Sequence, residues 1–256
     1  IAWFSVGGDE PRADLPGIAL VFFVDSCGFL FSAFTLFLIQ LPALVHDAAN
    51  RHASILNAVV EGFSATWRDV PVRLMVIIFS VFAFFFRGPY MVGIPVLADM
   101  RFDEGALAFG MISSAFGVGA LIGTLAAGSF PRPPERWYGP LLLIDLMILG
   151  CTFFLYATAP TVEWAMAAAV VGALIDGYMM VLLMSWFQAR IPPHLLGRVM
   201  SVVMFCNSGL APLSYALSGA LIRISLEGVF WGAGTILVML GLISLMFRTT
   251  RTLGLR

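Results

Sequence analysis

The chain has 256 residues, of which 60% are hydrophobic and only 11% are charged, and its mean hydropathy is +0.96. Soluble domains are about half apolar and about a quarter charged, so we expect a polytopic membrane protein with an all-α fold. A formal net charge of −1 excludes a global basic field, so nucleic acid is not an expected partner. The odd number of cysteines, all within apolar runs, predicts neither a disulfide framework nor a metal site.

Seven apolar runs are long enough to cross a bilayer core, which takes about 20 helical residues. In chain order we expect spans over residues 15–41, 72–97, 105–130, 137–159, 162–189, 197–222 and 226–247. Residues 1–8 are apolar but too short to span the bilayer. Because the chain begins at Ile1 without a Met or a signal-peptide pattern, we expect a fragment or a processed chain.

Local signals predict how several of these spans begin and pack. Thr161 and Ser225 are expected to cap the helices that follow them. Gly119 and Gly123 form a small-xxx-small pair, which favours close packing of two helices. Residues 54–69 have helical amphipathic spacing, and we expect either an interfacial helix on the bilayer or a linker helix packed on the bundle.

A polar stretch that begins at Gln188 reads Gln-Ala-Arg-Ile-Pro-Pro-His-Leu-Leu-Gly-Arg-Val-Met-Ser. Its two prolines, of which Pro192 is the first, are expected to end one helix. Gly197 and Arg198 are expected to begin the next helix, so the residues between form a turn at a membrane surface.

The arginines indicate the orientation, because positive residues accumulate in short cytoplasmic loops. All 14 basic residues are Arg. If the stretch after Gln188 is cytoplasmic, ten Arg lie inside and three outside, with Arg87 left within a span. We therefore expect a multi-pass protein of the bacterial cytoplasmic membrane with a cytoplasmic C-terminus.

Four stretches resemble one family in their order and spacing. "QARIPPHLLGRVMSVVMF" resembles the loop between spans ten and eleven of the major facilitator superfamily, closest to the branch of enterobactin exporters and macrolide efflux proteins. "FVDSCGFLFSAFTLFLIQLP" resembles the sixth span, "VVEGFSATWRDVPVRLMVI" the central linker and "FGMISSAFGVGALIGTLAAG" the eighth span. The loop "SFPRPPERW" departs from the family, because it lacks the acidic-Gly-Arg-Arg pattern often found there.

The resemblance covers nearly the whole chain and implies spans six to twelve of a twelve-span fold. Residues 1–41 then end the N-terminal half, 42–71 form a cytoplasmic linker with an amphipathic helix, and 72–256 form the C-terminal six-helix half.

Four ionisable residues lie within the predicted spans: Asp25, Arg87, Asp145 and Asp176. A charge at the bilayer centre costs about 2.5–3.5 kcal/mol on insertion scales, so each needs a partner, a cavity or protonation. Residue counting puts Arg87 and Asp176 roughly 15–20 Å from the outer face, and the resemblance implies that both of their spans line a central cavity. We expect the two to meet, either as a binding or proton-coupling pair or as a structural pair.

The remaining candidates have two interpretations each. Asp25 matches a residue common in the family's sixth span, and it either couples protons or makes a helix-packing hydrogen bond. Asp145, close to the start of its predicted span, is expected near the headgroups. The Gly88-Pro89 pair is expected to unwind its helix locally. Tyr90 and Asn207 line a substrate cavity or belong to the core.

The resemblance implies a secondary active transporter, a proton-coupled exporter of lipophilic drug-like or siderophore-like small molecules. The alternative is a half-transporter that is structural or assembles with a partner half supplying the missing N-terminal spans. We find no phosphate-binding glycine loop, nucleophile elbow or zinc motif in the sequence, so we expect no ATP coupling, no enzyme activity and no cofactor or metal.

Overall fold

The structure is a computed structural model that describes residues 15–38, 62–64, 66–131, 133–134 and 137–246. All secondary structure in these ranges is helical, which confirms the predicted all-α fold. Seven helical stretches among the described residues are long and apolar enough to cross a membrane, as predicted. The chain divides into two units, residues 1–53 and 54–256, which we describe separately. The apolar segment 1–8, most of the predicted linker and the residues after 246 lie outside the described residues.

The first unit contains one described helix, α1, over Leu15–Leu38. The hydroxyl of Ser26 donates to the carbonyl oxygen of Phe22 at 2.7 Å, four residues back in the same helix. Such a local bond satisfies a hydroxyl within an apolar helix. Asp25 lies near the middle of α1, and its role stays a prediction.

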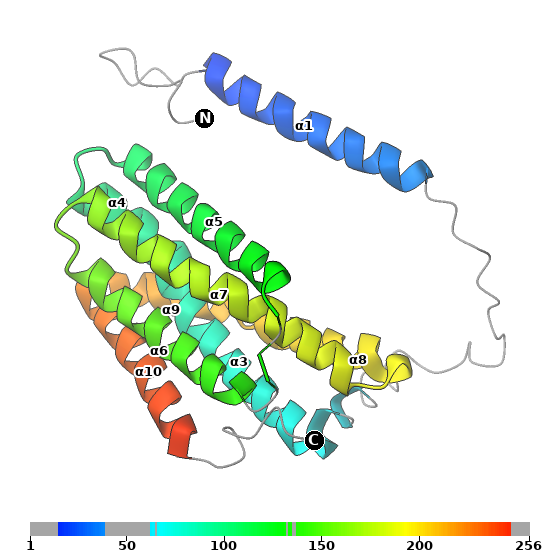
Figure 1. Ribbon diagram of the computed structural model, residues 1–256. Helices are drawn as coiled ribbons and strands as arrows, with labels where there is room; N and C mark the ends of the chain where they lie inside the picture. The colour runs from blue at the N-terminus through cyan, green and yellow to red at the C-terminus, as the bar shows by residue number, and fades with distance from the viewer. Residues whose placement is uncertain (1–14, 39–61, 65, 132, 135–136, 247–256) are drawn as a thin grey trace. The chain divides into compact units, whose positions relative to one another are not determined.

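The second unit is a bundle of six spans (Figure 1). In chain order its elements are α3 (Val70–Gly88), a π-helical turn (Pro89–Gly93), α4 (Ile94–Arg101), α5 (Ala106–Ser129), α6 (Tyr138–Ala157), α7 (Val162–Arg190), α8 (Pro193–Met204), a second π-helical turn (Phe205–Gly209), α9 (Ala211–Ile222) and α10 (Leu226–Met246). Two of the six spans are therefore composite, because a π-helical turn joins α3 to α4 and another joins α8 to α9.

Helix α5 packs closely along α7, as Figure 1 shows, and small residues make this possible. A Cβ atom on Gly119 would lie 2.5 Å from the carbonyl oxygen of Val170, and one on Gly123 would overlap the carbonyl oxygen of Leu174. Gly177 makes a similar approach from α7 to the backbone of α5. The glycine pair therefore packs two helices, as predicted.

Helices α6 and α10 meet through a reciprocal glycine contact. A Cβ atom on Gly150 would lie 2.8 Å from the carbonyl oxygen of Gly234, and one on Gly234 would lie 2.7 Å from that of Gly150. Two backbones can approach this closely only where neither residue carries a side chain.

The Gly88-Pro89 pair widens its helix into a π-helical turn and does not unwind it, which corrects the prediction. The N–H of Gly88 donates to the hydroxyl of Ser214 on α9 at 2.8 Å, and this hydroxyl donates to the carbonyl oxygen of Phe84. A regular α-helix would join the Gly88 N–H and the Phe84 carbonyl directly. A side chain from α9 is therefore inserted into the hydrogen-bond ladder of α3, which is a known cause of local helix distortion.

The polar stretch after Gln188 is shorter than predicted. Helix α8 begins at Pro193 with Pro192 as its N-cap, and the N–H of Leu196 donates to the carbonyl oxygen of Pro192 at 3.1 Å. Gly197 and its neighbour Arg198 lie inside α8, so the prediction that they open the helix is wrong. The reason is that a proline at the first helical position needs no N–H partner and has a helical φ.

The described end of the linker packs on the bundle, while the choice between an interfacial helix and a packed linker helix for residues 54–69 stays a prediction because 54–61 lie outside the described residues. A Cβ atom on Gly62 would lie 2.8 Å from the carbonyl oxygen of Arg198 in α8. Asp69 caps α3 by accepting from the N–H of Val72 at 3.2 Å. The Arg190 guanidinium at the end of α7 donates to both carboxylate oxygens of Asp69, with its Nε 3.1 Å from Oδ2. These contacts join the linker, α3, α7 and α8 at one end of the bundle.

Candidate functional site

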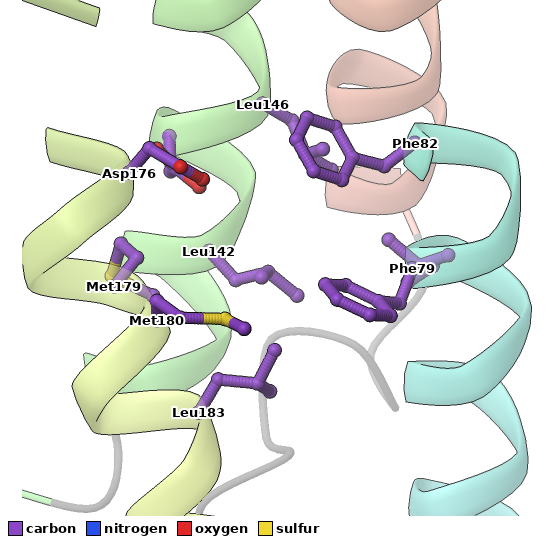
Figure 2. Close-up of a pocket in the computed structure, with 10 residues that line it drawn as sticks. Phe79, Phe82, Leu142, Leu146, Asp176, Met179, Met180 and Leu183 are labelled. Atoms are coloured by element: carbon purple, nitrogen blue, oxygen red, sulfur yellow. The ribbon is translucent and has the colours of Figure 1, made fainter. Parts of the chain in front are cut away.

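Two carboxyl side chains line one small cavity between α3, α6 and α7. Asp145 comes from α6 and Asp176 from α7, and the cavity has a volume of about 20 Å³. Figure 2 shows Asp176 pointing from α7 into the space that Phe79 and Phe82 enter from α3. The rest of the lining is apolar and consists of Ile78, Phe79, Phe82, Leu142, Leu146, Met179, Met180 and Leu183.

The hairpin of α6 and α7 places the two acids at the same level. Asp145 precedes Pro160 in the connecting turn by fifteen residues, and Asp176 follows it by sixteen. The two helices run in opposite directions from this turn, so side chains equally far from it lie side by side. Thr161 fixes the start of α7, because its hydroxyl accepts from the N–H of Trp164 at 3.4 Å, which confirms the predicted cap.

The two carboxyl groups differ in their surroundings. The Asp145 side chain is only 4% exposed, and its Oδ1 atom has no hydrogen-bond partner in the part of the chain that the structure describes. Asp176 is half-buried. Asp145 is therefore the inner carboxyl of the pair, and Asp176 is the one closer to the edge of the cavity.

Arg87 is not the partner of Asp176. Among the described residues the ion pairs join Arg101 to Glu227 and Arg190 to Asp69, and Arg87 is absent from the lining of the Asp176 cavity. The α3 residues at the cavity include Phe82, five residues before Arg87. Five residues correspond to about 140° around an α-helix and about 7.5 Å along it, so Arg87 points elsewhere.

The predicted cavity residues do not gather at one place. Tyr90 is buried in the core, where its ring stacks on Phe86 with centroids 5.4 Å apart and lies 4.8 Å from Phe116. Asn207 lies in the second π-helical turn, is half-buried, and has an Oδ1 atom without a partner among the described residues. Tyr90 therefore packs in the core, and Asn207 is a polar residue at a separate place. No cluster of three or more metal-ligating side chains occurs in the described ranges.

Asp145 was expected near the headgroups because its depth was counted from the start of its predicted span. It lies near the start of α6, but α7 is nine residues longer than α6 (29 against 20 residues) and reaches beyond that start. Counting from the shared turn at Pro160, which both helices have in common, would have paired Asp145 with Asp176.

Comparison with known proteins identifies the family of this bundle. A profile of the Major Facilitator Superfamily matches residues 13–214, which is more than half of the chain. The chain belongs to the Major Facilitator Superfamily. Among curated relatives, "Uncharacterized MFS-type transporter y4rN" of Sinorhizobium fredii is 26% identical over 213 residues, covering 80% of this chain and 50% of the relative. "Macrolide efflux protein A" of Streptococcus pyogenes is 21% identical over 237 residues, covering 91% of this chain and 58% of the relative.

The chain spans about half the length of the curated relatives that it matches. No solved structure matches it. The family, together with the seven long apolar helical stretches among the described residues, fits the predicted polytopic membrane protein.

Proposed function

We propose that this chain forms part of a secondary active exporter that uses protons to drive the efflux of lipophilic small molecules. The family supports transport, and a relative named as a macrolide efflux protein supports export of drug-like compounds. The observation that carries proton coupling is Asp176, a carboxyl group in the middle of a transmembrane helix beside a cavity whose lining is apolar apart from Asp176 and Asp145. Ionisable groups at such positions in transporters mark ion pathways and proton relays.

In the proposed cycle Asp176 gains a proton on one side of the membrane and loses it on the other. The resemblance to the family implies that α3 and α7 line a central cavity between two halves that rock about a shared site. The half-buried position of Asp176 fits this role, because a proton carrier needs contact with water in at least one state. We place the chain in a bacterial cytoplasmic membrane with its C-terminus inside, on the basis of its Arg distribution.

The proposal is tested by proton-driven efflux of a fluorescent macrolide from cells that produce the chain. Asp176→Asn is expected to reduce export to the level of cells without the chain, because the amide cannot carry a proton, while membrane insertion is unchanged. Asp99→Asn, which alters an exposed carboxyl on α4, is the matched control and is expected to retain export. Proton-driven export at the wild-type rate by Asp176→Asn would refute the proposed coupling. If the unaltered chain exports nothing, the alternative of a half-transporter that needs a partner half is favoured.

A further inference from the structure

Asp145 presents a chemical problem that the proposed function alone does not solve. Its side chain is 4% exposed and its Oδ1 atom lacks a hydrogen-bond partner among the described residues. An ionised carboxylate held in this way would be desolvated without compensation, which is strongly unfavourable. A protonated carboxyl group removes the charge and supplies an O–H donor that needs one nearby acceptor.

Among the described residues, the side chains around the cavity provide Asp145 with one acceptor and no cation. Helix α3 contributes Ile78, Phe79 and Phe82, and α6 and α7 contribute apolar residues besides the two acids. Helix α5 packs on α7 through glycine contacts with the backbone, and α10 packs on α6 in the same way. The first-turn acid of α10, Glu227, is paired with Arg101. Asp176 is therefore the ionisable partner that the described structure offers to Asp145.

We propose that Asp145 and Asp176 form a single proton-binding site that holds one shared proton. Two carboxylates in one apolar cavity cannot both be ionised without strong repulsion, whereas one acid and one carboxylate can share an O–H···O bond. The cavity of about 20 Å³ exceeds the 10–15 Å³ or so that a single water molecule needs, so a water can bridge the two groups.

The proton balance of this site is simple. Loading transfers one proton from a hydronium ion to the doubly ionised pair, and release returns that proton to water. The half-buried Asp176 exchanges the proton with water, while the buried Asp145 stabilises the loaded state as the hydrogen-bond partner. The cavity is too small for a drug-like molecule, since ligand pockets have volumes of about 300–1,000 Å³.

This inference deepens the proposed function, but its test needs no transport. The purified full-length chain in lipid nanodiscs is titrated by infrared spectroscopy, and the carbonyl stretch of protonated carboxyl groups is measured. Exposed carboxyls have pKa values of about 4, so at pH 7 they are ionised and do not contribute. We expect the wild-type chain at pH 7 to have one protonated carboxyl more than the Asp145→Asn/Asp176→Asn double variant, a difference to which Asp25 in α1 does not contribute because both proteins contain it. A difference of zero or of two protonated carboxyls between the wild-type chain and this double variant would overturn the inference of a shared proton.

The single variants test the coupling between the two groups. Interacting acids release protons in two macroscopic steps that belong to the pair. Asp145→Asn and Asp176→Asn are each expected to show one midpoint that lies between the two wild-type midpoints, at least one pH unit from either. If each single variant keeps one wild-type midpoint unchanged, the acids are independent and the inference is wrong. Asp99→Asn, at an exposed carboxyl, is the control and should leave both midpoints unchanged.

Circular dichroism checks that each variant remains helical, so that a lost carbonyl band reports the substitution and not unfolding. The two proposals fail in different ways. Proton-driven export by Asp176→Asn refutes the proposed coupling and leaves the titration result intact. Independent midpoints, together with loss of export in Asp176→Asn, refute the shared proton and leave the proposed function standing.

Discussion

A methyl group added at Gly123 tests the close packing of α5 on α7. The substitution Gly123→Ala puts a Cβ atom 2.9 Å from the backbone carbon of Leu174 and 2.9 Å from the backbone nitrogen of Tyr178, and overlapping the Leu174 carbonyl oxygen. Carbon atoms pack best at about 3.5–4.0 Å, so the two helices must separate by about 1 Å along this contact.

The cost follows from what that separation does to the interface. A gap of about 0.5–1 Å loses a quarter to a half of each dispersion contact, and overpacking typically costs about 1–3 kcal/mol. We expect the upper part of this range, because the obstructing atoms belong to a helix backbone and cannot rotate away. Alanine is favoured over glycine in helices by about 1 kcal/mol, which leaves a net destabilisation of about 2 kcal/mol.

The same helix supplies a matched control. A Cβ atom on Gly117 meets nothing within 4 Å, so Gly117→Ala is expected to stabilise α5 by up to about 1 kcal/mol. The six tryptophans of the chain allow unfolding in mixed micelles to be followed by fluorescence. The two variants should differ by about 3 kcal/mol in free energy of unfolding. Equal stability of Gly123→Ala and Gly117→Ala would refute the close packing described for these helices.

Two further contacts give predictions measured by the same unfolding assay. Ser214→Ala is expected to cost about 1–3 kcal/mol, because the buried N–H of Gly88 loses its acceptor and the Phe84 carbonyl its donor, whereas Ser208→Ala, at an exposed hydroxyl, should change little. Asp69→Asn is expected to keep the cap of α3 but lose the ion pair with Arg190, costing about 0.5–1 kcal/mol that disappears at high salt, since both side chains are partly exposed. Asp69→Ala also removes the cap and should cost about 1 kcal/mol more; equal effects of the two substitutions would show that the cap contributes nothing.

The spans and several of their starting points could be predicted because they depend on local properties. Length and hydropathy alone identify the helices. The caps at Thr161 and Ser225 follow from a hydroxyl placed before a helix, and the structure confirms the second with a bond of 2.9 Å from the N–H of Gly228 to the Ser225 hydroxyl. The glycine pair in α5 was equally predictable, because small residues at that spacing in a span usually indicate close packing of two helices.

The carboxyl pair could not be predicted in the same way, because it depends on how two helices of unequal length align. Depth was counted from the start of the predicted span for Asp145 but from the outer face for Arg87 and Asp176, which separated Asp145 from Asp176 and grouped Asp176 with Arg87. The sequence also did not indicate which face of α3 packs against its neighbours. Counting residues gives a level along a helix, but the contacts of Phe79 and Phe82 decide which face of α3 meets α7.

The two π-helical turns have a consequence for comparing this chain with its relatives. A π-helical turn closes its hydrogen bond over five residues where an α-helix uses four, so it corresponds to a one-residue insertion. Relatives with regular helices at Pro89–Gly93 would align only with a gap of one residue, and the positions beyond it would otherwise be matched to the wrong side of the helix. Deleting one residue from this turn would rotate α4 by about 100° and carry Ile94 and Leu97, both fully buried, out of the core.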